Sequence, residues 1–449
     1  MFKDRTYYAA LFRIALPIIA QNFVSSLLNV IDVTMIGQLG EVAIASVGLA
    51  NQVFFLMILM LFGAYSGVGV FTAQFWGKHD VTSIRKVLGI GLMIGLSGSL
   101  LFTVLAILLP RPVLSFYTQD PAVIAAGSSY LRIVGWSYCI TAVTFAYSSV
   151  LRSTGHVRVP MVVSIAALSL KTLLNYGLIL GHFGLPALGV EGAAIATLIA
   201  RLVEMVAILT VVYARKLPPA ARIVEMTSFS REFLARVLKT SLPVLFNEML
   251  WSLGVTTYNM VYGRIGTEAI AAVNVASSIE NLAFVLFMGI ADATGILIGN
   301  RIGAGDEEYA VSSARQSLLL TITGAILVGL VILVASQPIL GLYNMSEQAA
   351  LNARNILRVM GLALWIRTTN LVVFIGVLRA GGDTRFCLVL DAGSVWLVGV
   401  PLALLGGLVL GLPVYQVYLM VIAEEAVKLG IGFWRFLSRR WITNLVQAA

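Results

Sequence analysis

The sequence predicts an all-α polytopic membrane protein, with twelve transmembrane helices in two parallel six-helix repeats that form two lobes around a central cavity. Composition is the first observation: 59% of the 449 residues are hydrophobic and 11% are charged, whereas soluble domains are about 25% charged. Apolar runs of roughly 18 to 25 residues recur along the chain, and each is long enough to cross a hydrocarbon core about 30 Å thick. Matching residues also lie 226 positions apart, which indicates an internal repeat.

Helices are the expected form of the apolar runs, because backbone polar groups in lipid must be satisfied internally and the runs lack the alternation of strands. The first run is too long for a signal-peptide core and has no small-residue cleavage site, so we expect it to remain as a helix. In chain order, we place the spans at residues 13–36, 47–74, 88–109, 126–150, 159–180, 190–213, 238–262, 273–299, 317–336, 350–378, 386–409 and 413–434.

The net charge of +9 is explained by its distribution and does not require nucleic acid as a partner. If the N-terminus is cytoplasmic, most of the 30 Lys and Arg residues fall on the cytoplasmic side, as the positive-inside rule requires. Those on the outer side are Arg111, Arg132, Arg264, Arg354 and Arg358. We therefore expect a multi-pass protein of the cell membrane, cytoplasmic or inner, with both termini in the cytoplasm.

No cofactor or metal site is expected from the residues that usually form one. Cys139 and Cys387 fall within or at the ends of expected helices, which argues against a disulfide framework or a metal site. The three histidines lie in loops and lack the spacing of a metal centre.

The internal repeat keeps its register over most of the chain. Six helices per copy is an even number, so the second copy enters the membrane from the same side as the first, as in parallel repeats. We expect an N-lobe at residues 1–214, a basic cytoplasmic linker at 215–239 and a C-lobe at 240–449. The matches at an offset of 226 include Leu16-Pro17 with Leu242-Pro243, residues 36–40 with 262–266, Gly63 with Gly289 and Asp80 with Asp306; after one inserted residue, Gly155 matches Gly382 and residues 184–186 match 411–413.

Three segments, taken together and in order, resemble the multidrug and toxic compound extrusion (MATE) family, in a DinF-like or NorM-like bacterial branch. They are residues 32–40, 150–155 and 184–197. The resemblance covers nearly the whole chain. It implies cation-coupled export of organic, often cationic, amphiphiles by rocking of two six-helix lobes.

Four acidic residues within the expected helices are candidates for a function: Asp32, Glu248, Asp292 and Asp391. A charged side chain at membrane depth costs about 2.5–3.5 kcal/mol on insertion scales, so it usually faces protein or water and has a function. Burial brings the titration of carboxyl groups in general toward neutral pH, which suits a proton-coupled carrier. Asp391 is expected to be structural or interfacial, as are the acids of the last helix.

In the N-lobe, the resemblance assigns Asp32 to the family's cation site. The family's fifth helix usually carries Asn and, four residues later, Asp or Asn; here these positions are Lys171 and Asn175, which share a helix face. A pair between Asp32 and Lys171 would either open when Asp32 is protonated or lock the lobe, and the lysine argues against a metal ion. Tyr138 and Thr197 are suggested as neighbours of this site, with ordinary packing as the alternative.

In the C-lobe, Glu248 resembles the helix 7 glutamate that belongs to the cation and substrate site of NorM-like members. Its repeat counterpart is Asn22, and the aspartate expected on helix 10 is replaced by Thr368, beside Arg367. Hard cations need several oxygen ligands and benefit from anionic ones, so H⁺ is favoured over Na⁺ as the coupling ion. Asp292 and Arg367 are expected to complete a charge network in this lobe.

Pro17 and Pro243 begin the equivalent first helices of the two repeats. A proline removes a backbone donor and permits a kink, which makes both positions candidate hinges. In the alternative, each proline lies in the first helical turn, where it is tolerated.

The leading interpretation is a proton-coupled antiporter, working as a monomer, that exports organic cations or amphiphilic drugs. The alternative is a flippase for lipid-linked precursors, which the wider superfamily also contains. A flippase for pyrophosphate lipids would need several cavity arginines, and the cations within the expected helices are Lys171, Arg201, Arg367 and Lys428. An enzyme is the least supported class, because no activated nucleophile or metal-ligand motif is present.

Overall fold

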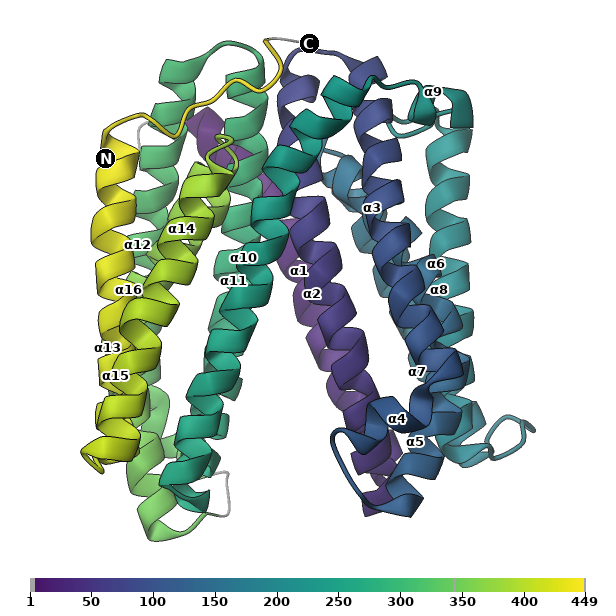
Figure 1. Ribbon diagram of the computed structural model, residues 1–449, viewed down its shortest axis with the longest axis vertical. Coiled ribbons are helices and arrows are strands. Elements are labelled where there is room, and N and C mark those ends of the chain that lie inside the picture. The colour runs from purple at the N-terminus through teal and green to yellow at the C-terminus, as the bar shows by residue number, and fades with distance from the viewer. Residues whose placement is uncertain (1–4, 342–344, 448–449) are drawn as a thin grey trace. The chain divides into compact units, whose positions relative to one another are not determined.

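The computed structural model describes residues 5–341 and 345–447, and helices make up most of this range (Figure 1). Their contacts divide the chain into two compact units. The N-terminal unit comprises residues 20–245, and the C-terminal unit comprises the described residues up to Ile19 and from Phe246 onward. Two long helices, α1 (Arg5–Gly37) and α10 (Arg231–Ile265), pass from one unit to the other. The all-α prediction is confirmed.

The N-terminal unit is a helical bundle. Apart from its parts of α1 and α10, it contains α2 (Glu41–Gly77), α3 (Val81–Leu108), α4 (Pro110–Ser115), α5 (Pro121–Val134), α6 (Trp136–Ser153), α7 (Arg158–Leu180), α8 (Gly189–Ala214) and α9 (Ile223–Thr227). Helix α2 packs against α3, α5 and α6, and α8 packs against α5, α6 and α7. Within this unit, helices α7 and α8 carry most of the polar residues discussed below.

The C-terminal unit is a second bundle, in which α-helical and π-helical segments alternate near the C-terminus. Its further elements are α11 (Thr267–Gly303), α12 (Glu307–Leu340), α13 (Glu347–Leu371), the π-helical η1 (Val372–Arg379), α14 (Thr384–Ser394), η2 (Val395–Gly399), α15 (Val400–Leu404), η3 (Leu405–Val409) and α16 (Val414–Leu437). Helix α13 packs against α11, α12 and α16.

Two of the expected spans are not single regular helices. The span at 126–150 is divided into α5 and α6, which are bent by 46°. Gly135 lies at this break, and a Cβ there would be 2.9 Å from the Leu131 carbonyl oxygen, so the bend needs a glycine. The span at 386–409 contains η2 and η3 on either side of Pro401, which has no backbone N–H to continue an α-helical pattern.

Within the described residues, nine helices are long and apolar enough to cross a membrane, and ten if the bent pair α5 and α6 forms one span. Helices α10 and α16 are also long, with 35 and 24 residues. They carry buried charged residues, among them Glu248 and Lys428. The expected total of twelve depends on these two helices and stays a prediction.

Equivalent residues of the two repeats perform the same local task. The Asp80 carboxylate caps α3 by accepting from the Ser83 N–H, and the Asp306 carboxylate caps α12 by accepting from the Tyr309 N–H. A glycine at 155 and its counterpart at 382 adopt φ values of 79° and 95°. Only glycine reaches this region without strain.

The first helix of each repeat begins in the unit of the other repeat. In the N-terminal unit, a Cβ on Gly63 of α2 would lie 2.7 Å from the Leu245 α-carbon of α10. In the C-terminal unit, a Cβ on Gly289 of α11 would lie 2.4 Å from Ile19 Cγ1 of α1. The two contacts are related by the repeat offset, so the same close packing occurs twice.

The prolines mark the places where α1 and α10 change units. Pro17 and Pro243 both lie inside their helices, so the alternative that places them in a first turn is wrong. The expected helix start at 238 came too late because α10 begins with a polar turn at Arg231, within the segment expected as a linker. That segment also contains α9. The lobe boundaries at 214 and 240 stay a prediction.

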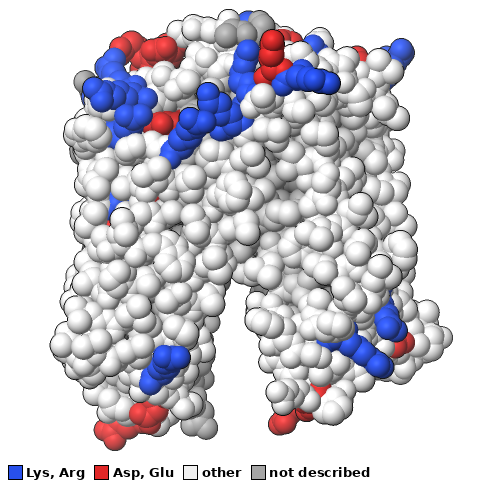
Figure 2. Space-filling view, viewed as in Figure 1, with Lys and Arg blue, Asp and Glu red and all other residues white. Residues whose placement is uncertain are grey.

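Basic side chains gather at one end of each unit in the view of Figure 2, and the middle of the visible face is almost free of charge. Many large apolar side chains of the described residues are exposed, as a lipid-facing surface requires.

Candidate functional site

Asp32 is held by three donors from a single face of α7. Its side chain is buried, and Lys171 Nζ lies 2.8 Å from its Oδ2. Asn175 Nδ2 donates to Asp32 Oδ1 at 2.8 Å, and the Thr172 hydroxyl donates to the same oxygen at 3.3 Å. Spacings of three and four residues place these donors on one face of the helix. The expected contact between Asp32 and Lys171 is present, and Thr172 is a partner that sequence analysis misses.

A second polar cluster of the N-terminal unit is centred on Arg201 and Glu204 of α8. Arg201 Nη1 lies 2.8 Å from Glu204 Oε2, and the Ser164 hydroxyl donates to Glu204 Oε1 at 2.6 Å. The Arg201 guanidinium lies 5.8 Å from the centroid of the Phe54 ring, within cation–π range. The Phe54 ring packs on Tyr138, with 5.8 Å between centroids.

The two residues suggested as neighbours of Asp32 have identifiable contacts. Tyr138 is fully buried, and its hydroxyl has no hydrogen-bond partner among the described residues. The Thr197 hydroxyl donates to the Ala193 carbonyl at 2.9 Å and lies near the hydroxyl of Tyr130. Tyr130 also interacts electrostatically with both Asp32 and Arg201. Tyr130 therefore connects the two clusters, although no sequence motif singled it out.

In the C-terminal unit, Glu248 is paired with Arg379. Arg379 Nη2 lies 2.9 Å from Glu248 Oε1, and both side chains are buried. Thr368, which replaces the expected helix 10 aspartate, is fully buried and donates its hydroxyl to the Leu364 carbonyl at 2.9 Å. Asn22, the repeat counterpart of Glu248, is half-buried in the N-terminal unit. The carboxylate of Glu248 thus has a cationic partner that sequence analysis misses.

Lys428 of α16 is the centre of a larger ion network. Its Nζ lies 2.7 Å from Asp391 Oδ1, 2.8 Å from Glu424 Oε1 and 3.8 Å from Glu425 Oε2. Further hydrogen bonds hold the carboxylates: Asn247 Nδ2 donates to Asp391 at 2.8 Å, the Tyr258 hydroxyl to Glu424 at 2.6 Å and Asn370 Nδ2 to Glu425 at 2.7 Å.

Arg367 extends this network toward α11. It forms an ion pair with Glu280 and lies 3.8 Å from Glu425 Oε1 through its Nε. Its Nη1 donates to the Tyr418 hydroxyl at 3.2 Å, and its guanidinium lies 5.6 Å from the centroid of the Phe284 ring. Arg367 therefore belongs to a C-lobe charge network, in which its acidic partners are Glu280 and Glu425.

Sequence analysis finds part of this network. Asp292, the residue expected to join Arg367 in this network, is half-buried in α11 and has an interaction partner. Glu280 is missed although it lies inside the expected span at 273–299, where an acid in an apolar run is a detectable signal. Asp391, Glu424 and Glu425 are expected to be structural or interfacial. In the structure all three form ion pairs with Lys428.

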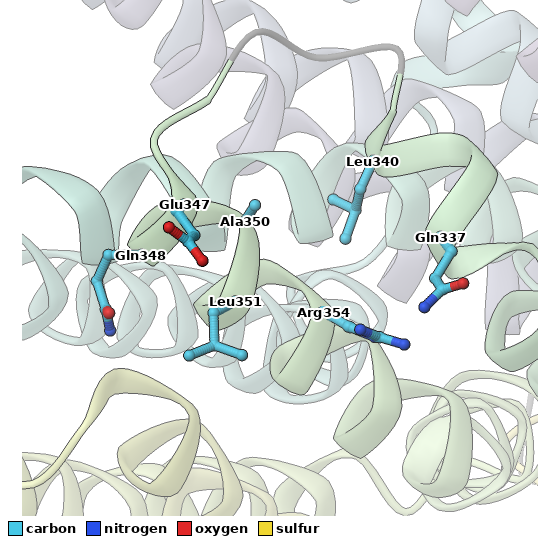
Figure 3. A pocket seen from close by; sticks show the side chains of 7 residues that line it. All are labelled: Gln337, Leu340, Glu347, Gln348, Ala350, Leu351 and Arg354. Atoms are coloured by element: carbon cyan, nitrogen blue, oxygen red, sulfur yellow. The ribbon is translucent and has the colours of Figure 1, made fainter.

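A hollow at the end of the C-terminal unit is lined by residues that belong to none of these clusters. It is formed by the end of α12 and the start of α13, as Figure 3 shows. Its lining is mixed polar and apolar, and consists of Gln337, Leu340, Glu347, Gln348, Ala350, Leu351 and Arg354. It contains none of the residues that bind Asp32, Glu248 or Lys428, and we do not assign a substrate to it.

Comparison with sequence families gives two matches to one family model, described as MatE. They cover residues 17–177 and 243–405. Both matches begin at the equivalent prolines, and the two segments correspond to the two copies of the internal repeat.

Several curated proteins resemble the chain over nearly its full length. An uncharacterized transporter, YisQ, of Bacillus subtilis is 26% identical over 439 residues, which is 98% of this chain and 96% of the relative. A probable multidrug resistance protein, NorM, of Thermotoga maritima is 24% identical over 431 residues, which is 96% of this chain and 92% of the relative.

Solved structures of similar fold are also known. The MATE transporter VcmN of Vibrio cholerae, crystallised as a mutant, has a TM-score of 0.89 at 20% identity and covers 98% of both chains. A MOP superfamily transporter from Pyrococcus furiosus has a TM-score of 0.83 at 21% identity and covers 96% of this chain and 95% of the other. At these identities the likeness demonstrates the fold.

Proposed function

The chain belongs to the MatE family of membrane transporters, and from this premise we propose that it is a secondary active antiporter that exports organic cations or amphiphilic drugs in exchange for protons. Relatives that match nearly the full length are described as multidrug resistance proteins. The proposal includes a place in the cell membrane, cytoplasmic termini and a monomer as the working form. The gathering of basic side chains at one end of each unit supports that orientation (Figure 2).

The observation that carries the proposal is the attachment of the Asp32 carboxylate to Lys171. Protonation of Asp32 would remove its negative charge and leave the Lys171 ammonium without a counter-ion. Breaking a buried ion pair on one side costs about 3–5 kcal/mol, because an uncompensated charge remains. A proton on Asp32 therefore favours a rearrangement of α7 relative to α1 in which Lys171 finds another partner.

Glu248 and Arg379 offer the same chemistry in the C-terminal unit. Protonation of Glu248 would release Arg379, so each unit contains a carboxylate whose protonation changes an ion pair. In this proposal Asp32 and Glu248 are coupling residues, with Asp292 as a further candidate, and Asn175, Tyr138 and Thr197 position the first site.

A proton fits these sites better than a sodium ion. Lys171 Nζ already lies at hydrogen-bond distance from Asp32, where it would repel a metal cation. At Glu248, Arg379 has the same effect, and Thr368 provides a hydroxyl that is bonded to its own helix. A sodium ion needs several free oxygen ligands, preferably anionic.

The flippase alternative would require cations that are available to an anionic pyrophosphate. Lys171, Arg367 and Lys428 are each paired with carboxylates, and Arg201 is paired with Glu204. These pairs neutralise the cations that such a lipid would need, so the antiporter is favoured.

The test is ethidium-driven proton movement in proteoliposomes that contain a pH-sensitive dye, with and without sodium. We expect proton movement that requires ethidium, ignores sodium and is lost in Asp32→Asn or Glu248→Gln. Glu308→Gln is the control, because Glu308 forms an exposed ion pair with Arg439. A sodium requirement, or a wild type that moves no protons with ethidium, would reject proton antiport and favour the flippase.

A further inference from the structure

The network around Lys428 and Arg367 contains more acidic than basic groups. Its cations are Lys428 and Arg367, and the carboxylates paired with them are Glu280, Asp391, Glu424 and Glu425. If every group were charged, the network would have a net charge of −2.

The neighbouring Glu248–Arg379 pair and three tyrosines do not change this imbalance. Glu248, which interacts electrostatically with Asp391, brings its own partner Arg379. Three tyrosines, Tyr258, Tyr262 and Tyr418, also face the network, and as neutral phenols they add no charge. In the N-terminal unit, by contrast, the pairs of Asp32 with Lys171 and of Glu204 with Arg201 each balance.

Half of the network is buried, and its other members, Arg367, Asp391 and Glu425, are half-buried. Glu424 and Lys428 are 3% and 4% exposed, and Glu280 is 9% exposed. A buried carboxylate without a counter-ion costs several kcal/mol, so groups in such a position take up a proton or another cation. Two added positive charges would therefore neutralise the network.

Two buried amides also point to a missing donor. Asn247 and Asn370 are 2% and 4% exposed, and their Nδ2 atoms donate to Asp391 and Glu425. The Oδ1 atom of each amide has no hydrogen-bond partner among the described residues. A carboxylic O–H or a cationic N–H in the network would satisfy such an acceptor, because buried polar groups are nearly always paired.

We propose that the Lys428–Arg367 network is a proton-loading site, which holds two protons until a cationic substrate displaces them. Each proton forms an O–H bond with a carboxylate and leaves as one positive charge of the substrate enters, so a monocation displaces one proton, a dication displaces two, and charge is conserved within the site. Loading two of the four carboxylates can leave Lys428 and Arg367 each with a charged partner, whereas protonation of Asp32 leaves Lys171 with none. This proposal rests on the proposed antiport for its role in transport, whereas the presence of the protons does not.

The test is the infrared absorption of protonated carboxyl groups in the purified protein at pH 7, without any drug, with D₂O exchange to identify the band. Charge counting predicts the direction for each variant. Glu424→Gln lowers the acidic excess by one and should reduce the band, and Lys428→Met raises the excess by one and should enlarge it. The double variant restores the excess and should return the band to the wild-type level.

Glu204→Gln is the matched control, because it removes a buried carboxylate from a balanced pair, and it should leave the band unchanged. Glu425→Gln serves as an independent variant if Glu424→Gln does not fold, and should also reduce the band. A wild type without the band, or a band that ignores all network variants, overturns the proposal. A band that follows the charge count in a protein that moves no ethidium would uphold this site and reject the antiport.

Discussion

Ser241 of α10 lies directly against Gly67 of α2, and a Cβ on Gly67 would be 2.5 Å from the Ser241 α-carbon. The contact involves backbone atoms, so a side-chain rotation cannot relieve it. Together with the contact of Gly63 with Leu245, it fixes the start of α10 in the N-terminal unit.

Gly67→Ala should therefore destabilise the protein by about 1–3 kcal/mol, the usual cost of overpacking. Unfolding in detergent measures this effect. Gly69→Ala is the control on the same helix, since its nearest atoms, Ser153 Oγ and Ser149 Oγ, would be 3.5 and 3.6 Å from the new Cβ. Equal losses in both variants would contradict the close contact.

Asp32→Asn and Lys171→Met should each destabilise the protein. The double variant should be destabilised by less than the sum of the two single effects. Each single change leaves a buried polar or charged group without its partner, at about 3–5 kcal/mol, whereas removal of both charges is often nearly neutral. A double-mutant cycle on the free energy of unfolding at neutral pH measures the coupling. Additivity within about 0.5 kcal/mol would show that the pair does not interact.

Docking of α9 on α3 should weaken in acid. The Arg222 N–H donates to Glu225 Oε2 at 2.7 Å, and Arg85 Nη1 lies 2.7 Å from Oε1. The Arg222 N–H and the Arg85 guanidinium lower the pKa of the Glu225 carboxyl below 4.5. Because the folded-state pKa is lowered, this stabilisation is present above the unfolded-state pKa and is lost as pH falls through the folded-state value.

Hydrogen exchange of residues 223–227, corrected for the intrinsic rate, should therefore accelerate as the pH falls from 7 through the lowered pKa of Glu225. Glu225→Gln should already exchange fast at pH 7 and should show little further change. If wild type and Glu225→Gln respond equally to pH, the carboxylate does not hold α9.

Trp441→Ala should destabilise the end of the C-terminal unit where α16 ends. Trp441 is fully buried, its Nε1 donates to the Phe436 carbonyl at 3.1 Å, and its ring stacks on Phe436 at 6.1 Å. Loss of a buried aromatic side chain costs about 3–5 kcal/mol. Trp434→Ala provides the comparison, because Trp434 is 57% exposed; a similar fall of Tm in both variants would contradict the role of burial.

The sequence is sufficient to predict the fold class, the repeat and the contact of Asp32 with Lys171. Hydropathy identifies the spans because every segment that crosses lipid must be apolar over a similar length. The repeat identifies equivalent positions in the two copies without a structure. Lys171 and Asn175 were predictable because their relationship is local, four residues apart on one helix.

The network around Lys428 could not be predicted in the same way. Glu280, Asp391 and Glu424 come from three different helices, and their meeting depends on which face of each helix is turned inward. A few isolated charges on a long apolar helix give no periodic signal for that rotation. The bend at Gly135 and the π-helical segments are also products of packing, since they change backbone hydrogen bonding without a marked change in composition.

The exchanged first helices bear on how such a chain could have originated. A single copy of the repeat would lack the segment that packs on Gly63, but two identical copies would supply it to each other, as in a domain-swapped dimer. In such an ancestor every ionic site would occur twice with the same charge. Fusion of the copies into one chain removes that constraint, so a balanced pair at Asp32 and an acid-rich network at Lys428 could evolve separately.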